Sequence, residues 1–144
     1  MIAALLLAAA TPAVPPPAIA PGIYSDVRMS EATGDLGGIE LRIDRADDGA
    51  LTVAAVWCQG WCNSIVEAPL TRAEDGYAFD FQEPIWSAGE ETAGPVYRMS
   101  LRPDGKALAL MVSGEGIDPS ERRRLKRIDK PFGLAVAAME TAAD

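Results

Sequence analysis

The chain has 144 residues, which suits a single domain. Hydrophobic residues make up 49% and charged residues 24%, a composition that supports a packed core. The net charge of -8 argues against general nucleic-acid binding and against docking on an anionic membrane, since both need a basic surface. Histidine is absent, which excludes Ser-His-Asp and Cys-His catalysis and removes the commonest metal ligand. We therefore expect no cofactor, no metal centre and no enzymatic activity.

Residues 1–20 predict a signal peptide and a Pro-rich linker. Residues 2–10 form an unbroken apolar run, typical of a signal-peptide core and too short to span a bilayer. No Lys or Arg precedes this run, so a buried or unfolded N-terminal helix is the alternative. Three small residues offer a cleavage site: Ala10, Ala13 and Ala20. Pro21 disfavours the last of these, because proline directly after the cut usually hinders the peptidase. The signal predicts a periplasmic or secreted protein with no membrane span after cleavage.

Residues 21–130 predict a β-domain. Apolar and polar residues alternate along five runs, the pattern of half-buried strands: residues 39–44, 51–57, 77–82, 97–102 and 108–112. Three Asp-Gly pairs lie between such runs and favour tight hairpins: Asp48-Gly49, Asp75-Gly76 and Asp104-Gly105. We expect a single small antiparallel meander barrel of about seven to eight strands, with a β-sandwich as the alternative.

The remaining segments are expected to be irregular or peripheral. Residues 87–94 and 113–120 read as polar loops. Residues 131–144 are Ala-rich and predict either a frayed tail or a short helix packed on a barrel mouth.

Cys58 and Cys62 are the only cysteines and flank a turn with Gly60 at its bend. In an exported chain they predict a disulfide. Loop entropy for so short a ring gives only about 2 kcal/mol, so the bond shapes the turn more than it holds the fold. A redox or metal role is the alternative. The three-residue spacing differs from that of thioredoxin-like motifs.

Aromatic and basic side chains supply the candidates for binding. Trp57, Trp61, Trp86 and Tyr97 are candidates for lining a ligand pocket or meeting a partner, although tryptophans also fill cores and close barrel ends. Residues 122–127 hold five basic side chains on an acidic chain, among them Arg124 and Arg127. They predict either an anion or partner site, or an edge strand whose charges discourage aggregation.

Two resemblances extend these expectations. Gly22-Ile23-Tyr24 resembles the Gly-x-Trp that opens the first strand of lipocalins. In lipocalins an arginine on the last strand packs over that tryptophan, which implies Arg124 or Arg127 here and a cup for a small apolar ligand. Residues 93–98 and 113–116 resemble the Ser-Gly-rich loop and tyrosine of periplasmic inhibitors of C-type lysozymes, which implies an inhibitor barrel.

Two functions follow from the sequence. The first is the binding of a small apolar or amphipathic ligand inside the barrel. The second is an envelope protein-interaction or inhibitor module that uses the Cys58–Cys62 turn and Trp61. The identity of the ligand or partner and the oligomeric state stay open.

Overall fold

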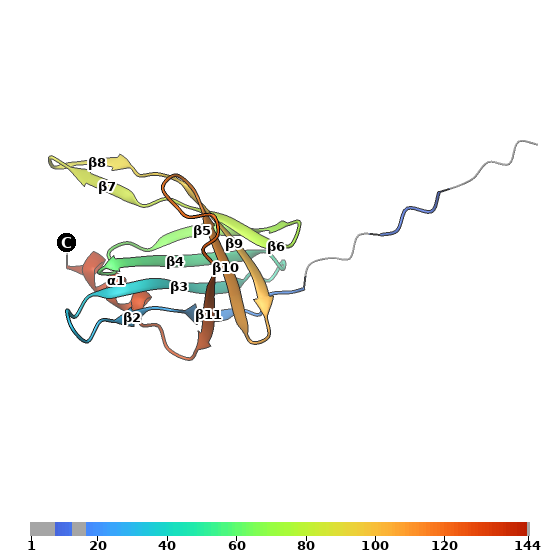
Figure 1. Ribbon diagram of the computed structural model, residues 1–144, viewed down its shortest axis with the longest axis horizontal. Helices are drawn as coiled ribbons and strands as arrows, with labels where there is room; N and C mark the ends of the chain where they lie inside the picture. Colours follow the sequence, from blue (N-terminus) through green and yellow to red (C-terminus); the bar gives the residue numbers. More distant parts are fainter. Residues whose placement is uncertain (1–7, 13–16, 144) are drawn as a thin grey trace, which may run out of the picture.

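The computed structural model describes residues 8–12 and 17–143. Eight strands form a closed antiparallel barrel, a small ninth strand extends it, and one helix lies outside (Figure 1). The barrel strands are β1 (Gly22–Ser25), β3 (Leu36–Arg45), β4 (Leu51–Gly60), β5 (Val66–Ala73), β6 (Gly76–Phe81), β9 (Tyr97–Asp104), β10 (Ala107–Ser113) and β11 (Arg123–Ile128). The short strand β2 (Arg28–Met29) pairs with β3.

The barrel is a meander that closes through β1. Each barrel strand pairs with its neighbour along the order β3-β4-β5-β6-β9-β10-β11-β1, and β1 also pairs with β3. Tyr24 of β1 lies opposite Leu41 on one side and Arg127 on the other. The predicted antiparallel meander barrel is confirmed. β11 is not an edge strand, because its first half pairs with β10 and its second half with β1. The predicted signal peptide and linker fall partly on residues 1–7 and 13–16, outside the described residues; residues 8–12 and 17–20 have no regular secondary structure.

The three Asp-Gly pairs lie at hairpins on the same end of the barrel. They connect β3 to β4, β5 to β6 and β9 to β10, as the sequence predicted. Gly49 and Gly105 have φ angles of 86° and 60°, which a side chain would disfavour. Because connections in a meander alternate between ends, all the other turns lie opposite. We call these two ends the turn end and the arm end.

A two-stranded hairpin projects from the arm end, well clear of the barrel (Figure 1). It comprises β7 (Pro84–Ser87) and β8 (Glu90–Ala93), and we call it the arm. Ala88 and Gly89 form its tip with φ angles of 53° and 79°. The expectation of an irregular loop at residues 87–94 is wrong. Every arm residue is exposed, so no face of the hairpin carries the apolar alternation that reveals a strand.

The barrel interior is occupied by the chain's own side chains. Inward-facing residues on every barrel strand are buried and belong to one cluster: Tyr24, Ile39, Leu41, Ile43, Val53, Ala55, Leu70, Tyr77, Phe79, Phe81, Met99, Leu101, Leu108, Leu110, Val112 and Leu125. Ile19, which precedes the first strand, is buried in the same cluster. The core therefore begins before residue 21, where the predicted barrel domain starts.

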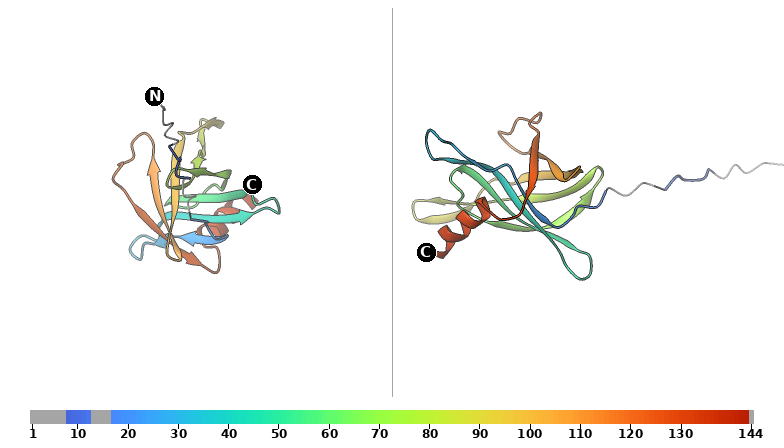
Figure 2. Two further views of the ribbon diagram at one scale, coloured as in Figure 1. Left: turned by 90° about the vertical axis from the view of Figure 1, so that its right-hand side faces the viewer. Right: turned by 90° about the horizontal axis from the view of Figure 1, so that it is seen from below.

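Helix α1 (Gly133–Ala142) lies along the outside of the barrel (Figure 2). Leu134, Val136 and Ala137 pack in a second cluster with outward-facing residues of β3 and β4, including Leu36 and Val56. The short helix proposed for residues 131–144 is present. The prediction that this helix packs on a barrel mouth is wrong. The helix packs on the outer wall of β3 and β4 instead, because that wall carries apolar side chains that the helix buries.

Candidate functional site

Glu40 fixes the start of α1. The carboxylate is fully buried on the outer face of β3. Its Oε1 accepts hydrogen bonds from the backbone N–H groups of Phe132 (2.9 Å) and Leu134 (3.1 Å). Its Oε2 accepts from the Gly133 N–H (3.1 Å) and the Ser25 hydroxyl (2.9 Å). The negative charge thus lies at the positive end of the helix and satisfies donors that the first turn leaves free.

The predicted disulfide is present between Cys58 and Cys62, and it lies under α1. Both cysteines are buried within the cluster that the helix covers. Gly133 packs so closely that an added Cβ would lie 3.2 Å from Cys58 Sγ. Sulfur buried beneath a helix is shielded from thiols and metals, so this arrangement is structural rather than reactive.

Trp61 projects from the disulfide turn and contacts the helix. Its indole Nε1 donates a hydrogen bond to Glu140 Oε1 at 3.1 Å. The side chain retains 41% exposure. Trp61 therefore joins the turn to the far end of α1 while one part of its ring stays accessible.

Trp57 lies inside the barrel near the arm end, as the alternation along residues 51–57 implies. Its ring meets Tyr97 edge-on at 5.3 Å between centroids and Phe81 at 6.2 Å. Trp57 and Tyr97 are only half-buried, whereas Phe81 is fully buried. These rings form the aromatic margin of the core at the arm end. Val66 and Ile117 pack on the same core and are also half-buried.

Trp86 lies on the arm, away from the other aromatics. It is 68% exposed, the highest fraction among the exposed large hydrophobic side chains of the described residues. Ile85 beside it and Val96 just after the arm are about half exposed. The hairpin therefore presents apolar surface that the barrel does not cover.

The two candidate arginines lie elsewhere on β11. Arg127 is at the turn end, with its guanidinium 5.7 Å from the centroid of the Tyr24 ring. Its position over Tyr24 is the one that the resemblance to lipocalins implies; the family itself stays a prediction. Arg124 forms an exposed ion pair with Asp104 at 3.0 Å. Neither arginine joins the aromatics of the arm end, and both bind groups of this chain.

Arg123, which the sequence analysis did not single out, forms the most buried ion pair. Its Nη1 lies 3.0 Å from Asp26 Oδ2, with side-chain exposures of 24% and 16%. Asp26 also accepts a hydrogen bond from the Ile39 N–H at 2.6 Å. With Glu121 on the second guanidinium nitrogen, two carboxylates already compensate the charge of Arg123. This cluster therefore closes the β1–β11 seam and does not attract an anion.

Two acidic groups near the arm end have displaced pKa values. Burial raises the pKa of Glu83, which lies at the base of the arm. The hydroxyl and the backbone N–H of Ser120 donate to Asp118 and lower the pKa of its carboxyl. The two carboxyls belong to different connections, Glu83 to the one between β6 and β7 and Asp118 to the one between β10 and β11.

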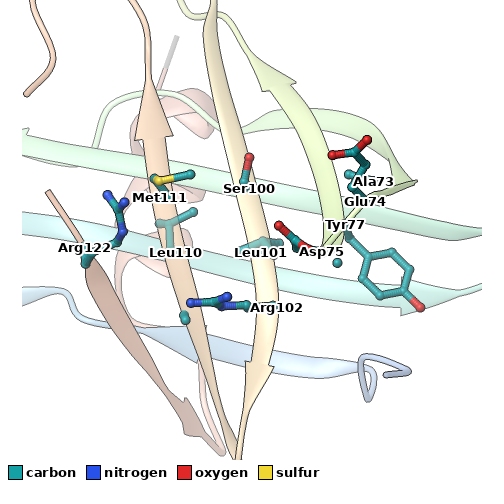
Figure 3. A pocket seen from close by; sticks show the side chains of 12 residues that line it. Ala73, Glu74, Asp75, Tyr77, Ser100, Leu101, Arg102, Leu110, Met111 and Arg122 are labelled. Carbon is teal, nitrogen blue, oxygen red and sulfur yellow. The ribbon is translucent and has the colours of Figure 1, made fainter. Parts of the chain in front are cut away.

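A groove of about 480 Å³ lies on the outer wall, away from the aromatic margin. Figure 3 shows Arg122 on one side and Glu74 on the other, with Ser100 and Met111 between them. Arg102 and Asp75 add a further charge of each sign to its lining. Of the basic residues 122–127 that the sequence offered as an anion or partner site, Arg122 lines this groove; none of the predicted aromatic residues, Arg124 or Arg127 does.

No group of three or more His, Cys, Asp or Glu side chains suited to a metal occurs among the residues that the structure describes. Within the same residues, no helix has the length and hydropathy needed to cross a bilayer.

The predicted site residues thus divide by location. Trp57, Trp61 and Tyr97 lie at the arm end of the barrel, and Trp86 lies on the arm itself. The roles of Glu40 at the start of α1 and of Ile19 in the core were not predicted from the sequence. A buried glutamate in an alternating strand looks like any exposed one, and Ile19 stands alone among prolines and alanines. The search of family models, of curated proteins and of solved structures found no match for this chain.

Proposed function

We propose that this chain is an exported, non-enzymatic binding protein that engages a protein partner through its arm. The exposure of Trp86 on the projecting hairpin carries this proposal. Tryptophan is enriched among the residues that dominate protein interfaces, where it fills a pocket on the partner. The apolar run at residues 2–10 and the disulfide support export.

The register of the arm indicates how it binds. Trp86 lies opposite Glu91 and Ile85 opposite Thr92, and adjacent residues of a strand point to opposite faces. The two large apolar side chains therefore cover both faces of the hairpin. A hairpin that is apolar on both faces is suited to insertion between two walls of a partner, rather than to lying flat on its surface.

Charge specifies the partner further. Glu91 lies opposite Trp86 on the arm, Glu90 is beside it on β8, and Glu83 precedes β7, so carboxylates lie on the arm and at its base. The complementary surface is an apolar groove with a basic rim. Rim charges of this kind mainly accelerate association, and salt weakens their effect.

A small apolar or amphipathic ligand is the second candidate, favoured by the half-buried pair Trp57 and Tyr97. In the described pairings the β5–β6 ladder ends at Thr71 opposite Ala78. Nearer the arm end, β5 pairs only with β4 and β6 pairs only with β9. Val66 on β5 is half-buried as a result. Because the deeper interior is filled, such a ligand would lie against the aromatic margin. This would be a lipocalin-like role.

The arm is favoured over the disulfide turn as the contact element. The ring that Cys58 and Cys62 close is covered by α1, and Trp61 already donates its N–H to Glu140. A partner that used this turn would meet the small or polar exposed residues Gln59, Gly60 and Asn63 and only part of one indole. On the arm, every residue is accessible.

Affinity capture from the exported proteins of the source tests the proposal. Immobilised wild type is compared with Trp86→Ala and with Met139→Ala, which removes a similarly exposed apolar side chain from α1. We expect one stoichiometric partner that wild type and Met139→Ala retain and Trp86→Ala loses. Equal recovery on all three contradicts the arm. Native mass spectrometry of the purified chain that shows a bound small molecule, lost in Trp57→Ala, supports the second candidate.

A further inference from the structure

Ile19 completes the core at the turn end of the barrel. Its side chain is 1% exposed and belongs to the same cluster as Tyr24 and Leu41. The segment that carries it runs in from the end opposite the arm (Figure 1). The turn end is thus closed by a residue that lies inside the predicted signal and linker region.

Three successive carbonyl groups hold this segment in place, and each accepts a hydrogen bond from a barrel side chain. The donors are Arg45 Nη2 to Ile19 O at 3.2 Å, the Tyr24 hydroxyl to Ala20 O at 2.7 Å, and Arg127 Nη2 to Pro21 O at 2.9 Å. Side-chain burial and backbone bonding together make residues 19–21 part of the folded domain.

A cut after Ala20 would damage this arrangement in two ways. It would remove the Ile19 side chain from the core, together with two of the three bonded carbonyls. It would also create a charged amine on Pro21, whose own carbonyl is bonded to the Arg127 guanidinium. Two positive groups would then lie close together at a barrel end that had lost its cover.

We propose that the leader is removed upstream of Ile19, after Ala10 or Ala13, and that the exported protein keeps Ile19 in its barrel. The inference rests on the proposed export. An endopeptidase adds water across one peptide bond, leaving a carboxylate on the alanine and a new amine on Thr11 or Val14. Each cut would follow a small residue that has another small residue two positions before it: Ala8 before Ala10, and Thr11 before Ala13.

Burial does not itself protect the bond after Ala20, because leaders are removed before the exported chain folds. What burial establishes is which residues the folded product uses. Proline directly after Ala20 disfavours that cut independently. Two unrelated properties, one of the peptidase substrate and one of the folded barrel, therefore both argue against a cut after Ala20 and for one of the two positions upstream.

The N-terminus of the exported protein, read by intact mass and N-terminal sequencing, tests the inference. A chain that begins at Thr11 or Val14 is the expected result. An exported chain that begins at Pro21 overturns the inference and leaves export standing. An intact chain that begins at Met1 and stays in the cytosol overturns export, and the cleavage with it.

A second measurement tests the role of Ile19 alone. Thermal unfolding of Ile19→Ala is compared with that of Ile85→Ala, which truncates an exposed isoleucine on the arm. We expect Ile19→Ala to lower Tm by about 5–10 °C and Ile85→Ala to leave it nearly unchanged. Equal melting temperatures for wild type and Ile19→Ala contradict the claim that the product needs this residue.

Discussion

The carboxylate of Glu40 on β3 accepts a hydrogen bond from the backbone N–H of Gly133, 93 residues later in the chain, at 3.1 Å. This contact places the first turn of α1 against the barrel wall, directly over Cys58. Sequence-distant residues thus decide where the helix begins and which surface of the barrel it covers.

Replacement of Glu40 by glutamine tests this anchor. A glutamine has one acceptor oxygen, and its amide N–H₂ would face backbone donors, so we expect a loss of about 2–3 kcal/mol in the free energy of unfolding. Amide exchange in α1 should accelerate more than exchange in the barrel. Denaturant unfolding and hydrogen exchange measure the two effects. Glu67→Gln, on the exposed face of β5, is the matched control. An equally small change in both variants would show that the anchor is unimportant.

Removal of the disulfide gives a second prediction. In Cys58→Ala/Cys62→Ala, loop entropy predicts a loss of about 2 kcal/mol in the free energy of unfolding. Because both cysteines pack under α1, helix amides should also exchange faster. Urea unfolding of this variant is compared with that of the reduced wild type, which should behave alike. If the oxidised wild type were no more stable than the double variant and the reduced wild type, the disulfide would not stabilise the fold as predicted.

The tryptophans should differ in what they contribute to stability. Trp57 packs on Tyr97 and Phe81, so Trp57→Ala should cost about 3 kcal/mol in the free energy of unfolding. The Trp86 side chain is mostly exposed, so the free energy of unfolding of Trp86→Ala should stay within about 0.5 kcal/mol of that of wild type. Both values come from denaturant titrations. A large cost at Trp86 would mean that the arm serves the fold instead of a partner.

The raised pKa of Glu83 predicts a pH dependence with a definite sign. Burial makes the folded protein hold this proton more tightly than the unfolded chain does, above the ordinary pKa of 4.5. Stability contributed by the protonated carboxyl is therefore present below pH 4.5 and is lost as the pH rises through the raised value. Glu83→Gln should flatten this part of the curve of unfolding free energy against pH. Superimposable curves for the two proteins would show that burial does not matter here.

Strands that face the core were predictable from the sequence, because one face of each is apolar. Ile39, Leu41 and Ile43 alternate with polar residues, and the Asp-Gly pair after them gives the hairpin. β11 was ambiguous because Leu125 is its one fully buried side chain and the basic residues Arg124 and Lys126 flank it. Pairing on both sides, which no local pattern encodes, decides that it is a barrel strand.

The features that define the candidate site were harder to foresee. The arm has no buried face, so its strands leave no periodic signal. The burial of Glu40 depends on a helix almost a hundred residues away. Ile19 becomes a core residue only once the barrel exists to receive it. The disulfide was predictable because the chain has two cysteines at close spacing.

The proposed contact between Trp86 on the arm and a protein partner can be measured by an equilibrium titration. The partner recovered from the exported fraction is titrated against wild type, Trp86→Ala and Met139→Ala. Loss of a buried interface tryptophan typically costs about 2 kcal/mol or more, so Kd for Trp86→Ala should rise by about 30-fold or more. Kd for Met139→Ala should equal that of wild type. The same Kd for Trp86→Ala and wild type would contradict the account.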